Sequence, residues 1–540
     1  MLFVKNIYAI TPLCFVIYKY FSLKIFMLKK PLQLRAYQQN ILTNILNKNS
    51  LVILPTGTGK TFLALALAVE KLKTHPNQKI LIMAPSKPLV HQHFLTFVEF
   101  LDAEIVEITG QVPAFNREKI YAQADIIIAT PQTIENDLIT GRLDSNNLSF
   151  VVFDEAHHAV SNYSYVFISK FFQTKDSKPQ HLGLTASPGS NQEKIDEIIN
   201  NLFIKHIEIR SEEDKDMSLY IMKKQIEWRK INLPEQFLSI KKALTVASKT
   251  LQKQLYNLGF SVENNSKRDL ILLQNKLHNL VANSGEKTVF RALSLLAGLI
   301  KVEYAIELLE TQGISALLGF FEKLKKQKSK AAKSLLSDEN FKFACEKAQY
   351  LSTEKLEHPK IPELVKIIEE NKNKQIIIFS QYRSTVDVII NSICAVCVPV
   401  KLIGQKEGMT QKQQQAAVER FRQGKSNVLV CTSVGEEGLD ILGVDIAIFF
   451  EAVPSEIRAI QRAGRVARHK VGKIIIFLAK GTRDEVYFWS AQWKKKQMKK
   501  TIDILKNNNF ADKSWQPDKN SFADKSSSSS KSHKNLLDFE

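Results

Sequence analysis

Short apolar runs alternate along the chain with longer segments in which apolar residues recur every three or four positions. Runs such as residues 51–54 and 79–83 have the length and composition of strands buried in a parallel sheet. Segments such as residues 62–73, which are rich in Ala and Leu, have the pattern of helices. The alternation of the two patterns predicts an α/β fold.

The apolar runs fall into two series, which predict two parallel-sheet lobes. The first lobe is expected at residues 29–210 and the second at residues 359–503. Many of the runs lead into a polar loop, and open α/β sheets place their functional sites at these ends of the strands. The runs of the first series are residues 51–54, 79–83, 125–129, 150–153 and 182–184, and those of the second are 375–380, 427–431, 444–450 and 473–478.

The segment between the lobes, residues 211–358, has a different pattern. Long helical periodicities dominate it, at residues 238–258, 267–282 and 288–311, and it has no strand–loop phosphate signal. A dense basic run at residues 323–333 is either the solvated face of a helix or a contact for a phosphate backbone. The segment is therefore predicted to be a helical insert.

The loop after the first apolar run has the composition of a phosphate-binding loop. Gly57 and Gly59 allow the backbone to turn its N–H groups toward a phosphate. Lys60 can reach the β- and γ-phosphates, and the Thr61 hydroxyl can bind Mg²⁺. The helix that follows favours an anion at its N-terminus. The residues expected to line the nucleotide are Thr56, Gly57, Thr58, Gly59, Lys60 and Thr61.

Two acidic residues directly follow the run at 150–153. At the end of a strand and downstream of a phosphate loop, Asp154 is expected to bind Mg²⁺ through water. Glu155 is expected to act as the general base on the attacking water. His157 is expected to couple this site to the other lobe. Together with the loop, these residues predict an enzyme that hydrolyses ATP with Mg²⁺ as cofactor.

Four arginines stand at helical spacing in the second lobe: Arg458, Arg462, Arg465 and Arg468. A solvated basic face is one interpretation of this spacing. However, Gln461, Arg462, Gly464, Arg465 and Arg468 stand at the positions of the sequence Q-R-x-G-R-x-x-R of superfamily 2 helicases. That resemblance implies that Gln461, Arg465 and Arg468 belong to the catalytic site, where the two arginines would neutralise charge on the γ-phosphate.

Composition supports a nucleic-acid partner. The chain of 540 residues carries a net charge of +20 and has a pI near 9.4, which indicates a polyanionic partner. The five cysteines are scattered, which favours a reducing compartment over a disulfide framework. Cys394 and Cys397 have no second ligand pair, so no structural metal site is predicted there.

Further motifs resemble those in the helicase part of the Hef/FANCM group of superfamily 2, and the resemblance covers residues 29–500. It implies two RecA-like lobes with an α-helical insert domain between them. The motif that begins at Gly481 is not a general helicase motif, and most superfamily 2 helicases have only a short linker in place of the insert. The motifs are Arg35-Ala-Tyr37-Gln38, Asp154-Glu155-Ala-His157, His358-Pro-Lys360, Ser380-Gln-Tyr382-Arg383, Thr432-Ser-Val-Gly435-Glu-Glu-Gly438-Leu-Asp440 and Gly481-Thr-Arg483-Asp-Glu485.

The resemblance also implies roles for individual residues. Gln38 would contact adenine, with Arg35 nearby. Gly438 and Asp440 would lie at the lobe interface, close to the nucleotide. The residues that would couple hydrolysis to lobe movement are His157, Thr185 and Ser187. The residues that would lie along the nucleic-acid track are Ser86, Lys87, Thr130, Ser380, Tyr382, Arg383 and Thr432.

The implied activity is that of an ATP-dependent DNA helicase or translocase that remodels forked or branched DNA in repair, with the insert gripping the branch. Two alternatives stay open from the sequence. One is an enzyme of the Dicer and innate-sensor type, which acts on double-stranded RNA. The other is a scaffold whose ATPase only times release. The protein is expected to be a monomer in the cytoplasm, or at the nucleoid of a prokaryote.

The two ends of the chain differ from the rest. Residues 1–28 are apolar and basic, and translation is expected to begin at Met27, with a membrane anchor as the alternative. Residues 504–540 are rich in Ser and Lys and are expected to be disordered. They are too few for the nuclease domain of archaeal Hef proteins, so no intrinsic nuclease is expected. A separate nuclease or a sliding clamp would be the candidate protein partner.

Overall fold

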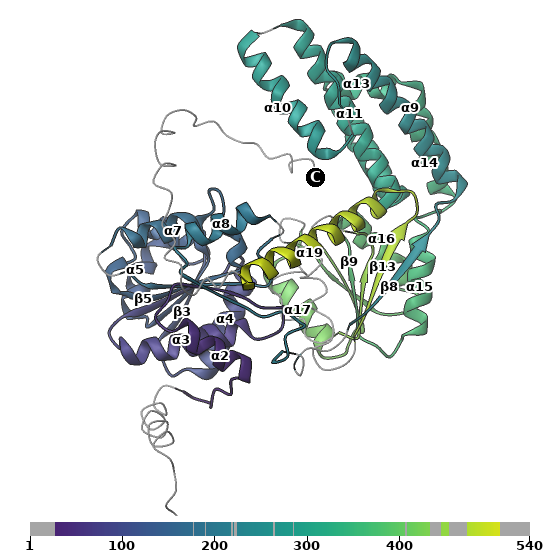
Figure 1. Cartoon of the computed structure of the whole chain (residues 1–540). Coiled ribbons are helices and arrows are strands. Elements are labelled where there is room, and N and C mark those ends of the chain that lie inside the picture. Colours follow the sequence, from purple (N-terminus) through teal and green to yellow (C-terminus); the bar gives the residue numbers. More distant parts are fainter. Residues whose placement is uncertain are drawn as a thin grey trace, which may run out of the picture.

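The structure is a computed structural model, and it describes residues 28–507 apart from 176–177, 190, 218–219, 221–223, 263–264, 285, 405–407, 433–443 and 453–471. Two sheet-containing lobes lie next to one another, and a helical part extends from the second lobe (Figure 1). The predicted fold class, two parallel-sheet lobes with a helical insert between them in the chain, is confirmed.

The first lobe is built on a seven-stranded parallel sheet in the order β3-β4-β2-β5-β6-β1-β7. The five runs predicted in this lobe are strands β1, β2, β4, β5 and β6, whereas β3 and β7 at the sheet edges lie outside the predicted series. The bounds are β1 Ser50–Ile53, β2 Lys79–Met83, β3 Ile105–Ile108, β4 Ile126–Ala129, β5 Leu148–Asp154, β6 Gln180–Thr185 and β7 His206–Ile209.

Helices cover both faces of this sheet, which explains why its strands are apolar at successive positions rather than at alternate ones. Helices α2, α3 and α4 pack on one face, around Tyr37 and Phe97. Helices α5, α6, α7 and α8 pack on the other, around Tyr165 and Phe172. The bounds are α2 Ala36–Ile45, α3 Lys60–Thr74, α4 Lys87–Phe100, α5 Ala114–Gln123, α6 Pro131–Ile139, α7 Ser164–Gln173 and α8 Gln192–Asn201.

The second lobe has a six-stranded parallel sheet in the order β10-β11-β9-β12-β13-β8. The four predicted runs of this lobe are strands β9, β11, β12 and β13. The strands are β8 Lys224–Ile231, β9 Ile376–Phe379, β10 Pro399–Leu402, β11 Val428–Cys431, β12 Ile446–Phe449 and β13 Gly472–Ala479. Helices of this lobe include α15 Lys360–Glu370, α16 Arg383–Ile393 and α17 Gln411–Arg422.

Strand β8 corrects the predicted start of the helical insert. It lies within residues 211–358, yet it pairs with β13 along its whole length and forms an edge of the second sheet. Its sequence alternates polar and apolar residues, with Ile226 and Trp228 exposed, because an edge strand is only half covered. Strand β8 therefore lacks the continuous apolar run that predicts four other strands of this sheet.

The insert itself is helical from Glu235 onward, which confirms the helices predicted at 238–258, 267–282 and 288–311. Its helices share one core that includes Phe237, Leu296 and Phe341. Neither these helices nor any other in the described ranges is long and apolar enough to cross a bilayer. The bounds are α9 Glu235–Asn257, α10 Lys267–Ser284, α11 Lys287–Thr311, α12 Ile314–Lys325, α13 Lys330–Ser337 and α14 Glu339–Thr353.

Helix α19, Arg483–Asn507, joins the two lobes. It begins beside β13 of the second lobe and runs across to the first lobe (Figure 1). There Leu505 is part of the first lobe's core, and Lys499 pairs with Glu213 at 2.7 Å. The predicted boundary at residue 503 therefore cuts a helix that is continuous to Asn507.

Acid is expected to destabilise the first lobe through His181, which lies fully buried on β6. Its Nδ1 donates to the Leu202 carbonyl at 2.9 Å, and burial lowers the pKa of this imidazole to about 4. The unfolded chain has a histidine pKa of about 6.5. The neutral His181 therefore contributes fully to the free energy of unfolding above pH ~6.5. This contribution is lost as the pH falls toward 4, at about 1.4 kcal/mol per pH unit.

The measurement is the thermal unfolding midpoint of the first lobe at several pH values in this window. His181→Gln removes the titrating group, so its midpoint should fall less steeply with acid than that of the wild type. His75, an exposed histidine for which the same change alters no buried group, provides the control His75→Gln. Equal pH slopes for wild type and His181→Gln would contradict the assignment.

Candidate functional site

The loop between β1 and α3 has the geometry that the sequence predicts for phosphate binding. Gly57 and Gly59 both have left-handed backbone conformations, with φ of 78° and 83°. The left-handed conformation favours glycine at Gly59, and a Cβ atom there would also come within 2.5 Å of the Gln38 amide nitrogen and displace it. Helix α3 begins at Lys60, which places its N-terminal N–H groups at the loop.

Gln38 and Tyr37, from the start of α2, hold this loop in place. The Gln38 amide donates to the carbonyls of Thr58 and Gly59 at 3.2 Å each, and the Tyr37 hydroxyl also donates to the Thr58 carbonyl. The Gln38 side-chain oxygen accepts from the Arg35 backbone N–H at 2.9 Å. The structure thus brings Arg35 and Gln38 next to the loop. Contact of either with adenine stays a prediction.

Asp154 is the last residue of β5, and its carboxylate is almost fully buried. The His93 ring lies 2.8 Å from this carboxylate. Burial raises the pKa of Asp154, but the charge and hydrogen bond of His93, together with the charge of Lys60, hold that pKa below its usual range. An anionic carboxylate beside a phosphate loop fits a divalent cation.

Glu155 and His157 start a line of contacts that leads away from the site. Glu155 has a left-handed backbone with φ of 49°, which is strained for this residue type. The His157 Nδ1 lies 3.3 Å from the Glu155 carboxylate and 3.2 Å from the Thr185 hydroxyl. The Ser187 N–H donates to the same hydroxyl at 3.2 Å, and the Ser187 hydroxyl donates to the sulfur of Met498 on α19 at 3.0 Å. The three residues predicted to couple the lobes are therefore adjacent.

His93 was missed by sequence reasoning. It lies on α4, which begins directly after Ser86, and it reaches the carboxylate of Asp154 through the protein interior. A histidine within a helix gives no local motif, so only the packing of α4 on the sheet reveals the contact. Through His93, helix α4, which begins after Ser86 of the predicted nucleic-acid track, contacts Asp154, the predicted Mg²⁺ ligand.

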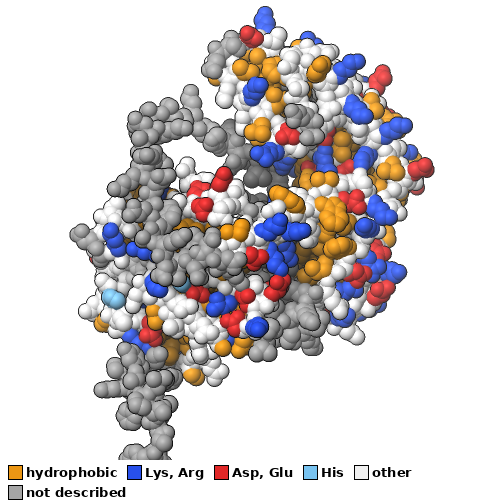
Figure 2. Space-filling view, in the orientation of Figure 1, with side chains coloured by type: hydrophobic (Ala, Val, Ile, Leu, Met, Phe, Trp, Pro, Cys, Tyr) orange, Lys and Arg blue, Asp and Glu red, His pale blue; other side chains and the backbone are white. Residues whose placement is uncertain are grey.

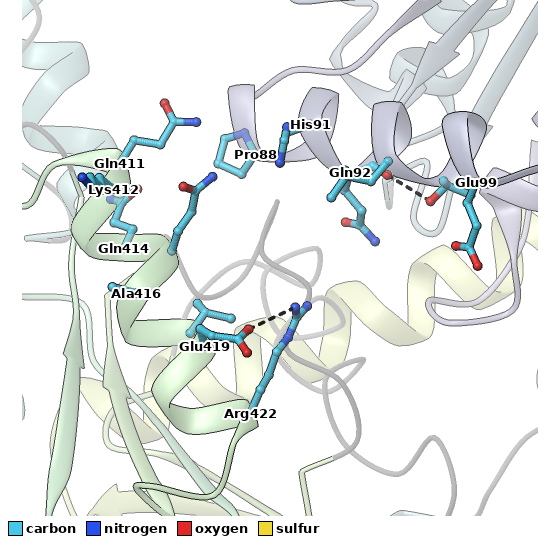
Figure 3. A pocket seen from close by; sticks show the side chains of 14 residues that line it. Pro88, His91, Gln92, Glu99, Gln411, Lys412, Gln414, Ala416, Glu419 and Arg422 are labelled. Carbon is cyan, nitrogen blue, oxygen red and sulfur yellow. Dashed lines mark hydrogen bonds and ion pairs between the residues drawn. The ribbon is translucent and has the colours of Figure 1, made fainter. Parts of the chain in front are cut away.

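A cleft of about 770 Å³ lies between α4 of the first lobe and α17 of the second (Figure 3). Side chains from both helices line it, and the amide of Gln111 donates to that of Gln411 across the lobes at 3.4 Å. Lining residues include Pro88, His91, Gln92, Gln411, Glu419 and Arg422. The lobes thus meet at few polar contacts here, as expected of parts that move relative to one another.

The residues predicted along the nucleic-acid track differ in accessibility. Arg383 is exposed at the start of α16, and Lys87 is half-buried at the start of α4. Ser380 is fully buried, and its hydroxyl donates to Glu451 at 3.2 Å. Thr432 is also buried, directly after β11, and contact of these residues with nucleic acid stays a prediction.

Three further residues of the track directly precede helices. Thr130 precedes α6 and is buried, with its hydroxyl 2.8 Å from that of Thr133. Ser86 precedes α4 and is half-buried, as is Tyr382 before α16. Two groups lie outside the described residues, and their roles stay predictions. They are the motif residues near the predicted lobe interface, Gly435, Gly438 and Asp440, and those of the arginine segment, Arg458, Gln461, Arg462, Arg465 and Arg468.

Comparison with known families matches three parts of the chain. Residues 35–195 match the family described as "DEAD/DEAH box helicase", and residues 359–470 match "Helicase conserved C-terminal domain". Residues 237–354 match a helical bundle described as "Putative ATP-dependent RNA helicase, helical bundle". The three matches follow the first lobe, the second lobe and the insert.

Curated relatives are similar over most of this chain. A protein of Methanocaldococcus jannaschii described as "Putative ATP-dependent RNA helicase" is 41% identical over 88% of this chain and 61% of its own length. The ATP-dependent DNA helicase mph1 of Neurospora crassa is 32% identical over 84% of this chain and 42% of its own length. The chain thus spans about two fifths to three fifths of the length of these relatives.

A solved structure gives a match over almost its full length. The helicase domain of Pyrococcus furiosus Hef is 40% identical, with a TM-score of 0.64, over 84% of this chain and 98% of that domain. It shares the two lobes and the helical insert described above. The chain therefore belongs to the Hef/FANCM group of superfamily 2 helicases, which are ATP-dependent enzymes.

Proposed function

We propose that this protein is an ATP-dependent DNA helicase or translocase that remodels forked or branched DNA. The observation that carries the proposal is the helical insert, seated on the second lobe in a chain that is 40% identical to the Hef helicase domain. The relatives named as DNA helicases support the same substrate. A long insert gives the enzyme a surface that a two-lobe helicase lacks.

The loop and the acidic pair are proposed to bind ATP together with Mg²⁺. The left-handed backbone at Gly57 and Gly59 suits a bound phosphate. The Lys60 ammonium lies 3.4 Å from the Leu54 carbonyl, at the start of the same loop. Thr61 and Asp154 would hold the cation, which when bound neutralises charge on the phosphate oxygens. Glu155 would accept the proton of the attacking water.

Closure of the lobes is proposed to complete the site. Arg465 and Arg468 of the second lobe would stabilise the charge that develops during hydrolysis. The contacts from Glu155 through His157 and Thr185 to Ser187 would transmit closure to α19. Each cycle of closure and opening would then advance the enzyme along one DNA strand.

The insert is proposed to hold the duplex arm through its basic run. The lysines of this run are all exposed, whereas Leu324, Ala331 and Ala332 between them are buried. They lie at the end of α12, in the following turn and at the start of α13, so they form one exposed basic edge. The lysines are Lys323, Lys325, Lys326, Lys328, Lys330 and Lys333. Such an edge suits a phosphate backbone.

Double-stranded RNA is the second candidate substrate. It is favoured by the description of the Methanocaldococcus relative and by that of the matching helical bundle, which both name an RNA helicase. The motifs of the two lobes do not read the 2′-hydroxyl of RNA. A direct comparison of substrates therefore decides between branched DNA and double-stranded RNA.

The deciding experiment is steady-state ATPase of the full chain at one fixed salt concentration. The activators are single-stranded DNA, a DNA fork, a four-way DNA junction and double-stranded RNA, with no nucleic acid as baseline. The fork or the junction is expected to stimulate turnover most, and Lys60→Ala is the inactive control. Strongest stimulation by duplex RNA would refute the proposal and favour the second candidate.

A further inference from the structure

The outward side of α19 carries a row of exposed aromatic and basic side chains that are not part of the predicted nucleotide site. Its members follow one another at intervals of three or four residues, so they lie on one side of the helix. Trp489 and Trp493 are 59% and 62% exposed. We refer to this row as the α19 stripe, and it consists of Val486, Trp489, Trp493, Lys496 and Lys500.

The opposite side of the same helix already provides the contacts that the fold needs. Phe488, Ala491, Met498 and Leu505 are buried, again at helical intervals. The α19 stripe is therefore not required to hold the helix in place. Two largely exposed indole rings leave much apolar area in water, and contiguous exposed apolar area of this kind marks an interaction site.

Strand β8 extends the aromatic end of the stripe. Trp228 is 47% exposed, and its ring lies 5.0 Å from that of Phe488, which in turn lies 5.2 Å from Trp489. Ile226 is also exposed on β8. On the face that carries α19, hydrophobic side chains adjoin a cluster of basic ones (Figure 2). The buried Phe488 ring thus positions aromatic groups from two separate elements next to one another.

The other end of the stripe is positive. From residue 486 to 502 the sequence has no Asp or Glu but contains Lys494, Lys495, Lys496, Lys499 and Lys500. Lys499 pairs with Glu213, whereas Lys496 and Lys500 have no ion pair within the ranges that the structure describes. A ligand that matches both ends needs flat apolar faces and negative charges in one chain.

We infer that the α19 stripe binds an unpaired nucleic-acid strand, with bases stacked on Trp489 and Trp493 and phosphates on Lys496 and Lys500. Aromatic platforms next to basic side chains are how proteins hold single strands without reading sequence. The two tryptophans are four residues apart, or about 6 Å along the axis. Neighbouring bases of a stacked duplex are about 3.4 Å apart, so the rings favour an extended strand over a duplex.

This inference rests on the proposed action on nucleic acid and adds a second contact to it. Met498, on the inward side of α19, touches Ser187 in the line of contacts from the hydrolytic site. A strand held on the outward side would therefore lie on the element that joins the lobes. The stripe suits the strand that unwinding releases, because that strand is unpaired.

The test measures binding of short DNA strands to the full-length protein without nucleotide, by fluorescence anisotropy. The probes are an oligothymidylate and an abasic strand of equal length, which keeps the phosphates and lacks the bases. The double variant W489A/W493A is expected to bind the oligothymidylate about ten-fold more weakly or worse, and the abasic strand as the wild type does. The double variant K496Q/K500Q should weaken the binding of both strands. It should also reduce the slope of log K against log salt concentration by about 1.4, at about 0.7 for each lost phosphate contact.

The control is F115A/K119Q, which removes an exposed aromatic and an exposed lysine four residues apart on α5. It should bind both strands as the wild type does, and all three variants should keep the basal ATPase activity of folded protein. Wild-type affinity of W489A/W493A for the oligothymidylate would overturn the inference and leave the stripe as a protein-docking face. Because these measurements need no ATP and no fork, a failed fork preference in the ATPase comparison is distinguishable from a failed α19 site.

Discussion

Replacing Glu155 by Gln is expected to reduce nucleic-acid-stimulated ATP turnover roughly 10³-fold, since a positioned general base contributes about 10² to 10⁴. Gln keeps the size and the strained backbone position of Glu155 but cannot accept the proton. The His157 ring, 3.3 Å away, keeps a hydrogen-bonding neighbour in the variant. The measurement is steady-state ATPase with saturating forked DNA.

The comparison with Lys60→Ala separates two ways of losing turnover. Lys60→Ala removes the ammonium at the phosphate loop and should weaken nucleotide binding, while DNA binding stays largely intact. Glu155→Gln should bind nucleotide as the wild type does and fail only in hydrolysis. Glu118→Gln, an exposed acid on α5, controls for loss of one negative charge. Wild-type turnover in Glu155→Gln would show that another group acts as the base.

The parts of the site that the sequence predicts lie at the carboxyl end of a strand or in the loop that leads from it into a helix. Lys60 and Asp154 are identified because a buried apolar run fixes where the strand ends and the parallel sheet gathers those ends at one edge. The contact of His93 with Asp154 depends on how α4 packs, and no local pattern encodes it. Strand β8 was missed because it alternates polar and apolar residues, so only its pairing with the distant β13 identifies it as part of the second sheet.

The motifs around Lys360 and Asp484 acquire a physical meaning only in the structure. From the sequence they are signatures of a family, with no role of their own. In the structure the Lys360 ammonium lies 2.5 Å from the Asp484 carboxylate, and both side chains are fully buried. Lys360 also donates to the Thr311 carbonyl at 3.2 Å, and Asp484 accepts from the Ala479 N–H at 3.3 Å. The two motifs therefore meet in one hydrogen-bonded ion pair.

Replacing Lys360 by Met is expected to destabilise the protein by about 3 to 5 kcal/mol, because it leaves the Asp484 carboxylate buried without its partner. Burial raises the pKa of Asp484, and Lys360 opposes that rise, so the variant should also bind a proton at this carboxylate more readily. The measurement is the midpoint of thermal unfolding. Lys366→Met changes an exposed lysine on the same helix, α15, and should have little effect.

The double variant K360M/D484N shows whether K360M loses stability through the unpaired charge of Asp484 or through altered packing around Lys360. Asn keeps an acceptor for the Ala479 N–H but carries no charge, so the double variant should recover much of the lost stability. If K360M and the double variant were equally unstable, the loss would come from packing around Lys360 rather than from an uncompensated charge.

The position of this ion pair gives it a consequence beyond stability. Thr311 ends α11 of the insert, and Asp484 lies at the start of α19 in the second lobe. Nearby, Arg483 pairs with Glu303 of α11, and its N–H donates to Glu310 at 3.0 Å. These charged contacts fix the insert to the second lobe at one junction. K360M should therefore lose fork remodelling more than DNA-stimulated ATPase, and K360M/D484N should regain fork remodelling. Equal losses of both activities in K360M would mean that the junction supports the fold alone and does not transmit movement of the lobe to the insert.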